Sequence, residues 1–295
     1  MSSHALYAAS PDWLVGCQNL EELLNGSEFR VLKATSRTLA GIARINGVEV
    51  FVKRVTSASW SKGIATRVFG SRARKTIRGA RILQRGRFLH PRVIAAFEQR
   101  NGGSIRASYV IAEYLRRPKV LSRFALADGR DFRWRQQFSG QLAETIRTLH
   151  DAGCYTRDLQ ETNLMIEAKD GVLRVYFTDV EDFRRRLSVP RRIRLFNLIH
   201  LDRSIGRFVS RSHRLRFLYN YAYDGRKPCR AVRHTLVAQV LRIRQRIERR
   251  QSFRQPPTAI VMPPPERRRN EGNVSIQLSS RAASSPWRDA ERTYS

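Results

Sequence analysis

The sequence predicts an α+β fold with two lobes, a small β-rich N-terminal lobe and a larger helical C-terminal lobe. Three observations predict it. Short runs rich in Val and Ile fill residues 28–55, apolar residues recur at helical spacing over 132–151, and a second helical pattern covers 192–250. Strands that come first and helices that come later indicate separate layers rather than an alternating α/β sheet. The chain of 295 residues can bury one sizeable core or two small ones.

The N-terminal lobe is predicted over residues 28–114, after an N-terminal segment of residues 1–27. Residues 28–55 indicate a β-meander, because three partly alternating apolar runs follow one another and Asn46-Gly47 separates the last two. An Asn-Gly pair marks a hairpin, since both residues tolerate positive φ. The remaining elements of this lobe are a helix and two strands, predicted over 71–86, 92–98 and 105–114.

The C-terminal lobe is predicted over residues 115–251. It opens with the helix at 132–151, and Gly153 is placed to stop that helix. Two short strands and the second helical region follow, over 163–167, 173–180 and 192–250. Residues 252–295 have no sustained periodicity and are rich in Pro, Ser and Arg, which predicts a disordered basic tail.

The charge of the chain is strongly positive, because 56 Lys and Arg stand against 25 Asp and Glu, a formal net charge of +31. Residues 51–97 hold twelve Lys and Arg and no acidic residue, and residues 184–250 hold twenty against three acidic residues. The interior carboxylates gather instead over 144–182. Such a field favours nucleic acid, an anionic membrane surface or phosphorylated substrates as partners.

The sequence indicates a cytoplasmic protein. Its three cysteines are odd in number and far apart, which fits a reducing compartment. We expect no membrane span, since no stretch approaches the roughly 20 apolar residues that a bilayer requires. We also expect no secretory signal, because the first residues lack a basic start followed by an apolar run.

Three pieces of sequence stand out as candidate chemistry. Lys53 ends the run Val50-Phe51-Val52, Asp158 and Asn163 bound the run DLQETN after the long helix, and Asp179 ends the apolar strand VYFT. Carboxylate and amide oxygens suit Mg²⁺, and a lysine supplies a point charge for phosphates. An aspartate can accept or orient the proton of an attacking hydroxyl. Each feature alone is common, but together and in this order they point to phosphoryl transfer.

This order resembles the eukaryotic-like protein kinase fold, with its strand lysine, its D-x-x-x-x-N catalytic loop and its metal-binding aspartate. The resemblance implies an ATP-dependent enzyme in which Lys53 holds phosphates and Asp158 is the catalytic carboxylate. It implies that Asn163 and Asp179 hold Mg²⁺. The lobe linker, Glu113 to Leu115, would meet the adenine, and the segment that ends at Gly41 would cover the phosphates.

The sequence departs from the kinase pattern at four places. The carboxylate that kinases carry on the N-lobe helix is missing, and the most similar position is Gly79. Either another carboxylate holds Lys53, or Lys53 is less well ordered. His-Arg-Asp reads Thr156-Arg157-Asp158, Asp-Phe-Gly reads Asp179-Val180-Glu181, and no G-x-G-x-x-G is present.

The short spacing and two runs in the C-terminal half, NLIHLDRS at 197–204 and RLRFLYNY at 214–221, narrow the resemblance. They are similar to the bacterial lipopolysaccharide kinases, which include Kdo and core-heptose kinases. This resemblance implies transfer of the ATP γ-phosphate to a sugar hydroxyl of the lipopolysaccharide inner core, at the cytoplasmic face of the inner membrane. The arginine clusters at 184–186, 191–194 and 242–246 would then bind an anionic glycolipid or membrane surface.

Two alternatives stay open at this point. A kinase-like chain without the helix carboxylate could be a catalytically impaired regulatory or scaffold protein. A basic chain could also bind nucleic acid, although its aromatic residues near 208–221 fall at core-like spacing rather than as stacking platforms. Nucleic acid is therefore the less favoured partner.

Overall fold

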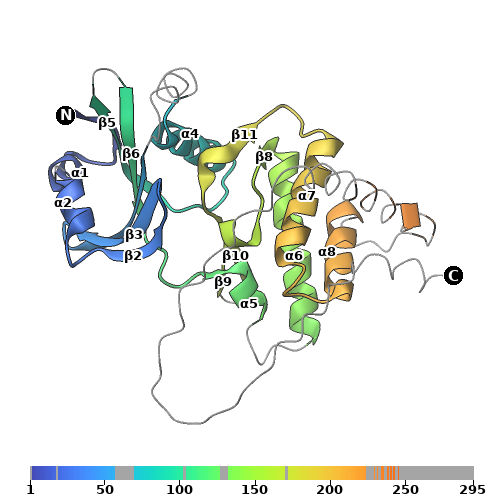
Figure 1. Ribbon diagram of the computed structural model, residues 1–295. Helices are drawn as coiled ribbons and strands as arrows, with labels where there is room; N and C mark the ends of the chain where they lie inside the picture. Colours follow the sequence, from blue (N-terminus) through green and yellow to red (C-terminus); the bar gives the residue numbers. More distant parts are fainter. Residues whose placement is uncertain are drawn as a thin grey trace, which may run out of the picture. The chain divides into compact units, whose positions relative to one another are not determined.

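Figure 1 shows the computed structural model of the chain, which describes residues 2–17, 19–56, 70–101, 104–126, 132–169 and 172–223, with scattered positions between 229 and 245. The chain divides into two compact units, residues 1–228 and 229–295, and every element named below lies in the first. The predicted tail, 252–295, and the turn glycines at 102–103 lie outside the described residues.

A six-stranded antiparallel sheet forms the N-terminal part, in the order β1-β5-β6-β4-β3-β2. The hairpin predicted at Asn46-Gly47 is confirmed, because both residues have positive φ, 50° and 74°. The strands are β1 (Ser2–Ala8), β2 (Arg30–Ala34), β3 (Thr38–Ile45), β4 (Val48–Thr56), β5 (Val93–Asn101) and β6 (Ser104–Glu113). The predicted meander and the two later strands are therefore present.

Residues 1–27, to which the sequence analysis assigned no elements, contain β1 and two short helices, α1 (Pro11–Gly16) and α2 (Leu20–Asn25). β1 pairs with β5 at the edge of the sheet. Leu20 and Leu24 of α2 are buried in the same apolar cluster as Val50 and Val52 of β4. The segment thus covers part of the sheet that holds Lys53.

The helix predicted at 71–86 is α4 (Arg72–Arg85), and its limits follow from its sequence. The Ser71 side chain caps the first turn by accepting a hydrogen bond from the Arg74 amide. Ala73, Ala80 and Leu83 are buried, while arginines occupy the exposed positions. The helix therefore packs with a narrow apolar face.

Glu98 of β5 ties the start of α4 to the sheet. Its side chain is fully buried, and it accepts hydrogen bonds from Arg74 Nε at 2.9 Å and Arg100 Nη2 at 2.5 Å. Burial alone would raise the pKa of this carboxyl, but hydrogen bonds from Ser71, Arg100 and Arg74 hold it below its ordinary value.

The C-terminal part contains a three-stranded sheet, β10-β9-β7, a two-stranded sheet, β11-β8, and four α-helices among the described residues. The predicted helix at 132–151 is confirmed as α6, and Gly153 follows it at φ 77°. The elements are β7 (Lys119–Val120), α5 (Leu121–Ala125), α6 (Phe132–Asp151), β8 (Cys154–Thr156), η1 (Glu161–Asn163), β9 (Leu164–Lys169), β10 (Val172–Phe177), η2 (Val180–Asp182), β11 (Phe183–Arg185), α7 (Arg191–Ile205) and α8 (Arg211–Tyr223).

The mixed α and β content, with strands first and helices later, is as predicted. The helical region predicted from 192 is divided, since α7 ends at Ile205 and α8 begins at Arg211. The lobe boundaries at residues 114 and 251 stay predictions.

α4 and η2 touch backbone to backbone at Gly79. A Cβ atom at this position would lie 1.8 Å from the carbonyl oxygen of Val180, so any side chain here displaces one of the two segments. Glycine usually destabilises a helix because its backbone is flexible. At position 79, however, the contact with Val180 leaves no room for a side chain.

We predict that Gly79→Ala lowers the free energy of unfolding by about 3 kcal/mol, because the added methyl overpacks this contact. Urea denaturation measures the change. The matched control is Gly140→Ala on α6, where the nearest atom would lie at 3.4 Å, and here stability should rise by about 0.5 kcal/mol. Equal stability of Gly79→Ala and the wild type would contradict the packing argument.

Candidate active site

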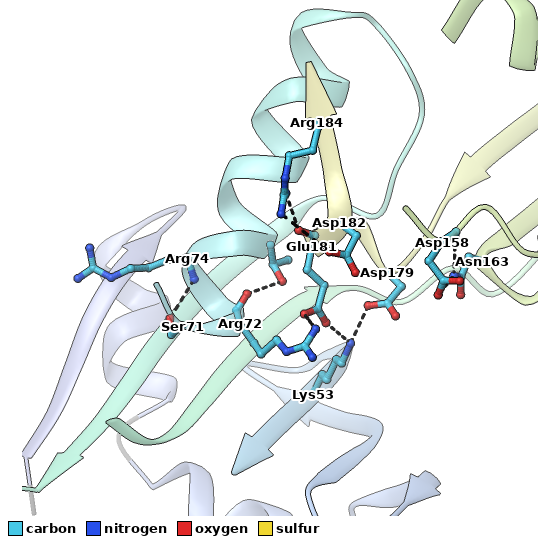
Figure 2. A network of polar contacts seen from close by, with 11 residues as sticks. Lys53, Ser71, Arg72, Arg74, Asp158, Asn163, Asp179, Glu181, Asp182 and Arg184 are labelled. Atoms are coloured by element: carbon cyan, nitrogen blue, oxygen red, sulfur yellow. Dashed lines mark hydrogen bonds and ion pairs between the residues drawn. The ribbon is translucent and has the colours of Figure 1, made fainter. Parts of the chain in front are cut away.

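Lys53 lies near the end of β4 and points into a pair of carboxylates (Figure 2). Its Nζ lies 2.7 Å from Asp179 Oδ1 and 2.6 Å from Glu181 Oε1. Burial alone would lower the pKa of Lys53, but the two carboxylates outweigh it and raise the pKa above its ordinary value. The lysine is therefore held as a cation at a fixed place.

Asp179 occupies a special backbone position between β10 and η2. Its φ of 50° and ψ of 54° place it in the left-handed region, which Asp tolerates better than most residues. The preceding residue, Thr178, donates its amide to the Asn163 carbonyl at 2.9 Å. Burial would raise the pKa of Asp179, but Lys53 lowers it overall. Its side chain is still 42% exposed, against 5% for Glu181.

Asp158 and Asn163 face one another across the loop that follows β8. Asn163 Nδ2 donates to the backbone oxygen of Asp158 at 3.1 Å and to its Oδ2 at 3.2 Å. The other carboxylate oxygen accepts from Gln160 Nε2. Both oxygens of Asp158 are thus oriented by the loop itself, and the Thr178 contact ties this loop to the segment that carries Asp179.

A buried polar network fixes β8, which leads into this loop. His150, at the end of α6, is fully buried, and its Nδ1 lies 2.7 Å from the Tyr221 hydroxyl. Its Nε2 lies 3.1 Å from Asn197 Oδ1, and Asn197 Nδ2 donates to the Thr156 carbonyl at 2.7 Å. Because the Asn197 amide faces Thr156 with its nitrogen, we assign the His150 proton to Nε2. This histidine is a scaffold residue.

Glu113 is the last residue of β6, and Leu115 lies two positions further along, where the chain passes to β7. The Glu113 amide donates to the Arg92 carbonyl at 2.9 Å, and Leu115 is half-buried. Their contact with adenine stays a prediction.

Gly41 lies within β3, opposite Val52 of β4. A Cβ atom there would lie 2.4 Å from the Arg30 carbonyl oxygen and 2.6 Å from the Phe29 ring, so strand packing accounts for this glycine. The turn between β2 and β3 is nearer Thr35, whose hydroxyl accepts from the Thr38 amide at 3.0 Å. A role of Gly41 in covering phosphates stays a prediction.

Few of the side chains that the structure describes are placed to bind a metal ion, and their donor atoms are oxygens. Among the described residues, no group of three or more His, Cys, Asp and Glu side chains is placed to hold a metal ion. Mg²⁺ keeps several waters and needs only one or two carboxylates, so Asp179 with the amide oxygen of Asn163 fits its preference.

From the sequence, either another carboxylate holds Lys53 or this lysine is less well ordered. The structure gives Glu181, which lies 128 positions further along the chain. It also brings in Arg72 of α4, whose Nη1 lies 2.6 Å from Glu181 Oε2. No local pattern marks either residue.

Lys53 is paired with Asp179, and the D-x-x-x-x-N loop is tied to the segment of Asp179 by the hydrogen bond from Thr178 to Asn163. This arrangement fits a phosphotransferase with a protein-kinase-like fold. The profile of the lipopolysaccharide kinase (Kdo/WaaP) family matches residues 35–221, more than half of the chain. The chain belongs to this family, and it is a kinase that acts on the lipopolysaccharide core.

One solved structure, WaaP in complex with acyl carrier protein, has the same fold. The match has a TM-score of 0.59 and 18% identity, and it covers 84% of this chain and 99% of that chain. No curated protein matches the chain by sequence. Within the described part of the chain, no helix combines the length and apolar character that crossing a membrane requires.

We predict that His150 makes stability depend on pH. Burial chiefly lowers its pKa from 6.5 to about 4 in the folded protein, so between these values the unfolded chain binds the proton more readily. The free energy of unfolding should therefore fall by about 2 kcal/mol between pH 7 and pH 5 through this residue. Urea denaturation of the wild type and His150→Gln at both pH values measures it. A pH dependence equal in the two proteins would contradict the assignment.

Proposed function

We propose that the protein transfers the γ-phosphate of ATP to a sugar hydroxyl of the lipopolysaccharide inner core, on a Kdo or a heptose, with Mg²⁺. The observation that carries the proposal is the convergence of Lys53, Asp179 and the Asp158–Asn163 pair, linked by the hydrogen bond from Thr178 to Asn163. These four residues come from three separate stretches of sequence, and phosphoryl transfer requires them together.

Each residue then has one task. The acceptor hydroxyl oxygen attacks the γ-phosphorus, the bond to the bridging β-phosphate oxygen breaks, and ADP leaves. Asp158 accepts the hydroxyl proton, and its orientation is fixed by Gln160 and Asn163. Lys53 contributes positive charge to the phosphates. Asn163 and Asp179 would hold Mg²⁺, which neutralises charge on the transferring group when bound.

Arg157, the exposed neighbour of Asp158 in the chain, is a cation that suits an anionic acceptor. Burial chiefly lowers the pKa of Arg184, and the positive charges of Arg78 and Arg157 lower it further. A sugar that carries phosphate or carboxylate groups would be attracted to this side of the site.

We predict that Asp158→Asn lowers kcat at least 100-fold, because a positioned general base contributes about 10² to 10⁴ in rate. The measurement is transfer of ³²P from γ-labelled ATP to dephosphorylated lipopolysaccharide core. The matched control is Asp151→Asn at the end of α6, an exposed carboxylate paired with Arg194, which should keep nearly full activity.

The proposed function fails if the folded wild type transfers no phosphate to any core acceptor and gains no thermal stability from ATP with Mg²⁺. Stabilisation by ATP without transfer would favour the regulatory or scaffold alternative.

We further propose that the loop between β11 and α7 binds the anionic face of the inner membrane from the cytoplasmic side. Leu187 at its tip is fully exposed, and Arg185, Arg191 and Arg192 around it are exposed as well. An apolar tip flanked by cations suits the boundary between headgroups and acyl chains.

Not every arginine of these clusters is available to lipid. Arg184 donates to the carbonyl oxygens of Glu181 and Phe183, and Arg194 donates to Asp151 at 2.5 Å and to the Val189 carbonyl at 3.0 Å. These two side chains hold the loop in place. The cluster at 242–246 lies partly outside the described residues.

We predict that replacing Arg185, Arg191 and Arg192 together by Ser weakens binding to phosphatidylglycerol vesicles about 100-fold, since each cation near such a surface contributes about 1 kcal/mol. Cosedimentation at low salt measures it. The control replaces three exposed cations of the β2–β3–β4 region, Lys33, Arg37 and Arg44, with the same change in net charge. Equal losses in both variants would mean that overall charge, and not this loop, sets the affinity.

A further inference from the structure

The helix over the lysine cannot supply a carboxylate to it. α4 contains no acidic residue, and its Gly79 has no room for a side chain because Val180 lies against it. In protein kinases the ion pair between the strand lysine and a helix glutamate must be in place for transfer. This chain must therefore hold Lys53 in another way.

Glu181 has the geometry for that task. One carboxylate oxygen lies 2.6 Å from Lys53 Nζ, and the other lies 2.6 Å from Arg72 Nη1 (Figure 2). The Glu181 side chain is only 5% exposed, so both carboxylate oxygens are shielded from water and each is paired with a cation. A buried carboxylate between two cations is a stable arrangement only while both stay in place.

Asp179 and Glu181 differ in exposure and in their neighbours, which suggests a different role for each. Both touch Lys53, but Asp179 is 42% exposed and lies beside the Asp158–Asn163 loop, where a metal ion would take it as a ligand. Glu181 is turned toward α4 and is bound there by Arg72. When Asp179 is drawn to the metal, Glu181 remains as the partner of the lysine.

We propose that Glu181 is the positioning residue that holds Lys53 for the nucleotide phosphates, in place of the missing helix carboxylate, and that Arg72 holds Glu181 in turn. The proposal rests on the proposed function. In this proposal one short segment supplies both the metal ligand, Asp179, and the partner of Lys53, Glu181. α4 contributes a cation where protein kinases contribute an anion.

The test compares Glu181→Gln and Glu181→Asp with Glu98→Gln, a matched control. Glu98 of β5 is also a buried carboxylate between two cations, Arg74 of α4 and Arg100 of β5, but it does not touch Lys53. The measurements are the Kd of metal-free ATP by calorimetry, KM for ATP and kcat with the lipopolysaccharide core, and Tm.

We expect Glu181→Gln to raise KM for ATP with Mg²⁺ about tenfold, with a further fall in kcat. Metal-free ATP binding should weaken less, because Asp179 still contacts Lys53 there. Glu181→Asp, which keeps the charge but shortens the side chain by one methylene, should recover part of the loss. Glu98→Gln should lower Tm and leave Kd and KM unchanged. This split between Tm and ATP affinity distinguishes positioning from a structural role.

Wild-type Kd, KM and kcat in a folded Glu181→Gln protein would overturn the inference and leave the proposed function standing. If that variant does not fold, Glu181→Asp decides, and an unchanged KM for ATP there overturns the inference too. A wild type that neither binds ATP nor transfers phosphate would overturn both the inference and the proposed function.

Discussion

The contact of Lys53 with two carboxylates is the interaction on which the site depends. It joins a strand of the first sheet to the segment after β10, and that segment is joined in turn to the catalytic loop through Thr178 and Asn163. A lysine taken from water needs such partners, since burial alone would drive its pKa down. These ion pairs and the Thr178–Asn163 hydrogen bond therefore hold β4, the segment after β10 and the loop after β8 together.

The large positive charge of the chain has two different uses. Part of it is internal, because Glu98, Asp202 and Glu181 each hold arginines, and the pair of Arg214 with Asp202 is nearly buried. Near the site, Asp179 and Glu181 are paired with Lys53, and Glu181 is also paired with Arg72, whereas Asp158 accepts hydrogen bonds from neutral amides. Exposed arginines such as Arg185 and Arg192 keep the surface positive.

Signals within a few neighbouring residues predict much of the fold. Elements and contacts that depend on residues far apart in the sequence could not be predicted in this way. Asn46-Gly47 and the periodicity of α4 and α6 are signals within a few residues, and they placed these elements well. β1 was missed because its sequence, SSHALYA, is partly polar and depends on β5 for its pairing. Lys53, Asp158, Asn163 and Asp179 could be chosen by spacing, whereas Glu181 is joined to Lys53 only by the fold.

The close approach of Gly79 to Val180 has a consequence for how such a site can change through evolution. A glutamate introduced at position 79 of α4 would collide with Val180, next to Glu181, and loss of Glu181 first would leave the lysine with Asp179 alone. Either single step passes through a damaged protein. A carboxylate at position 79 therefore requires the Val180 backbone to move as well, so the two ways of holding the lysine differ by more than one substitution.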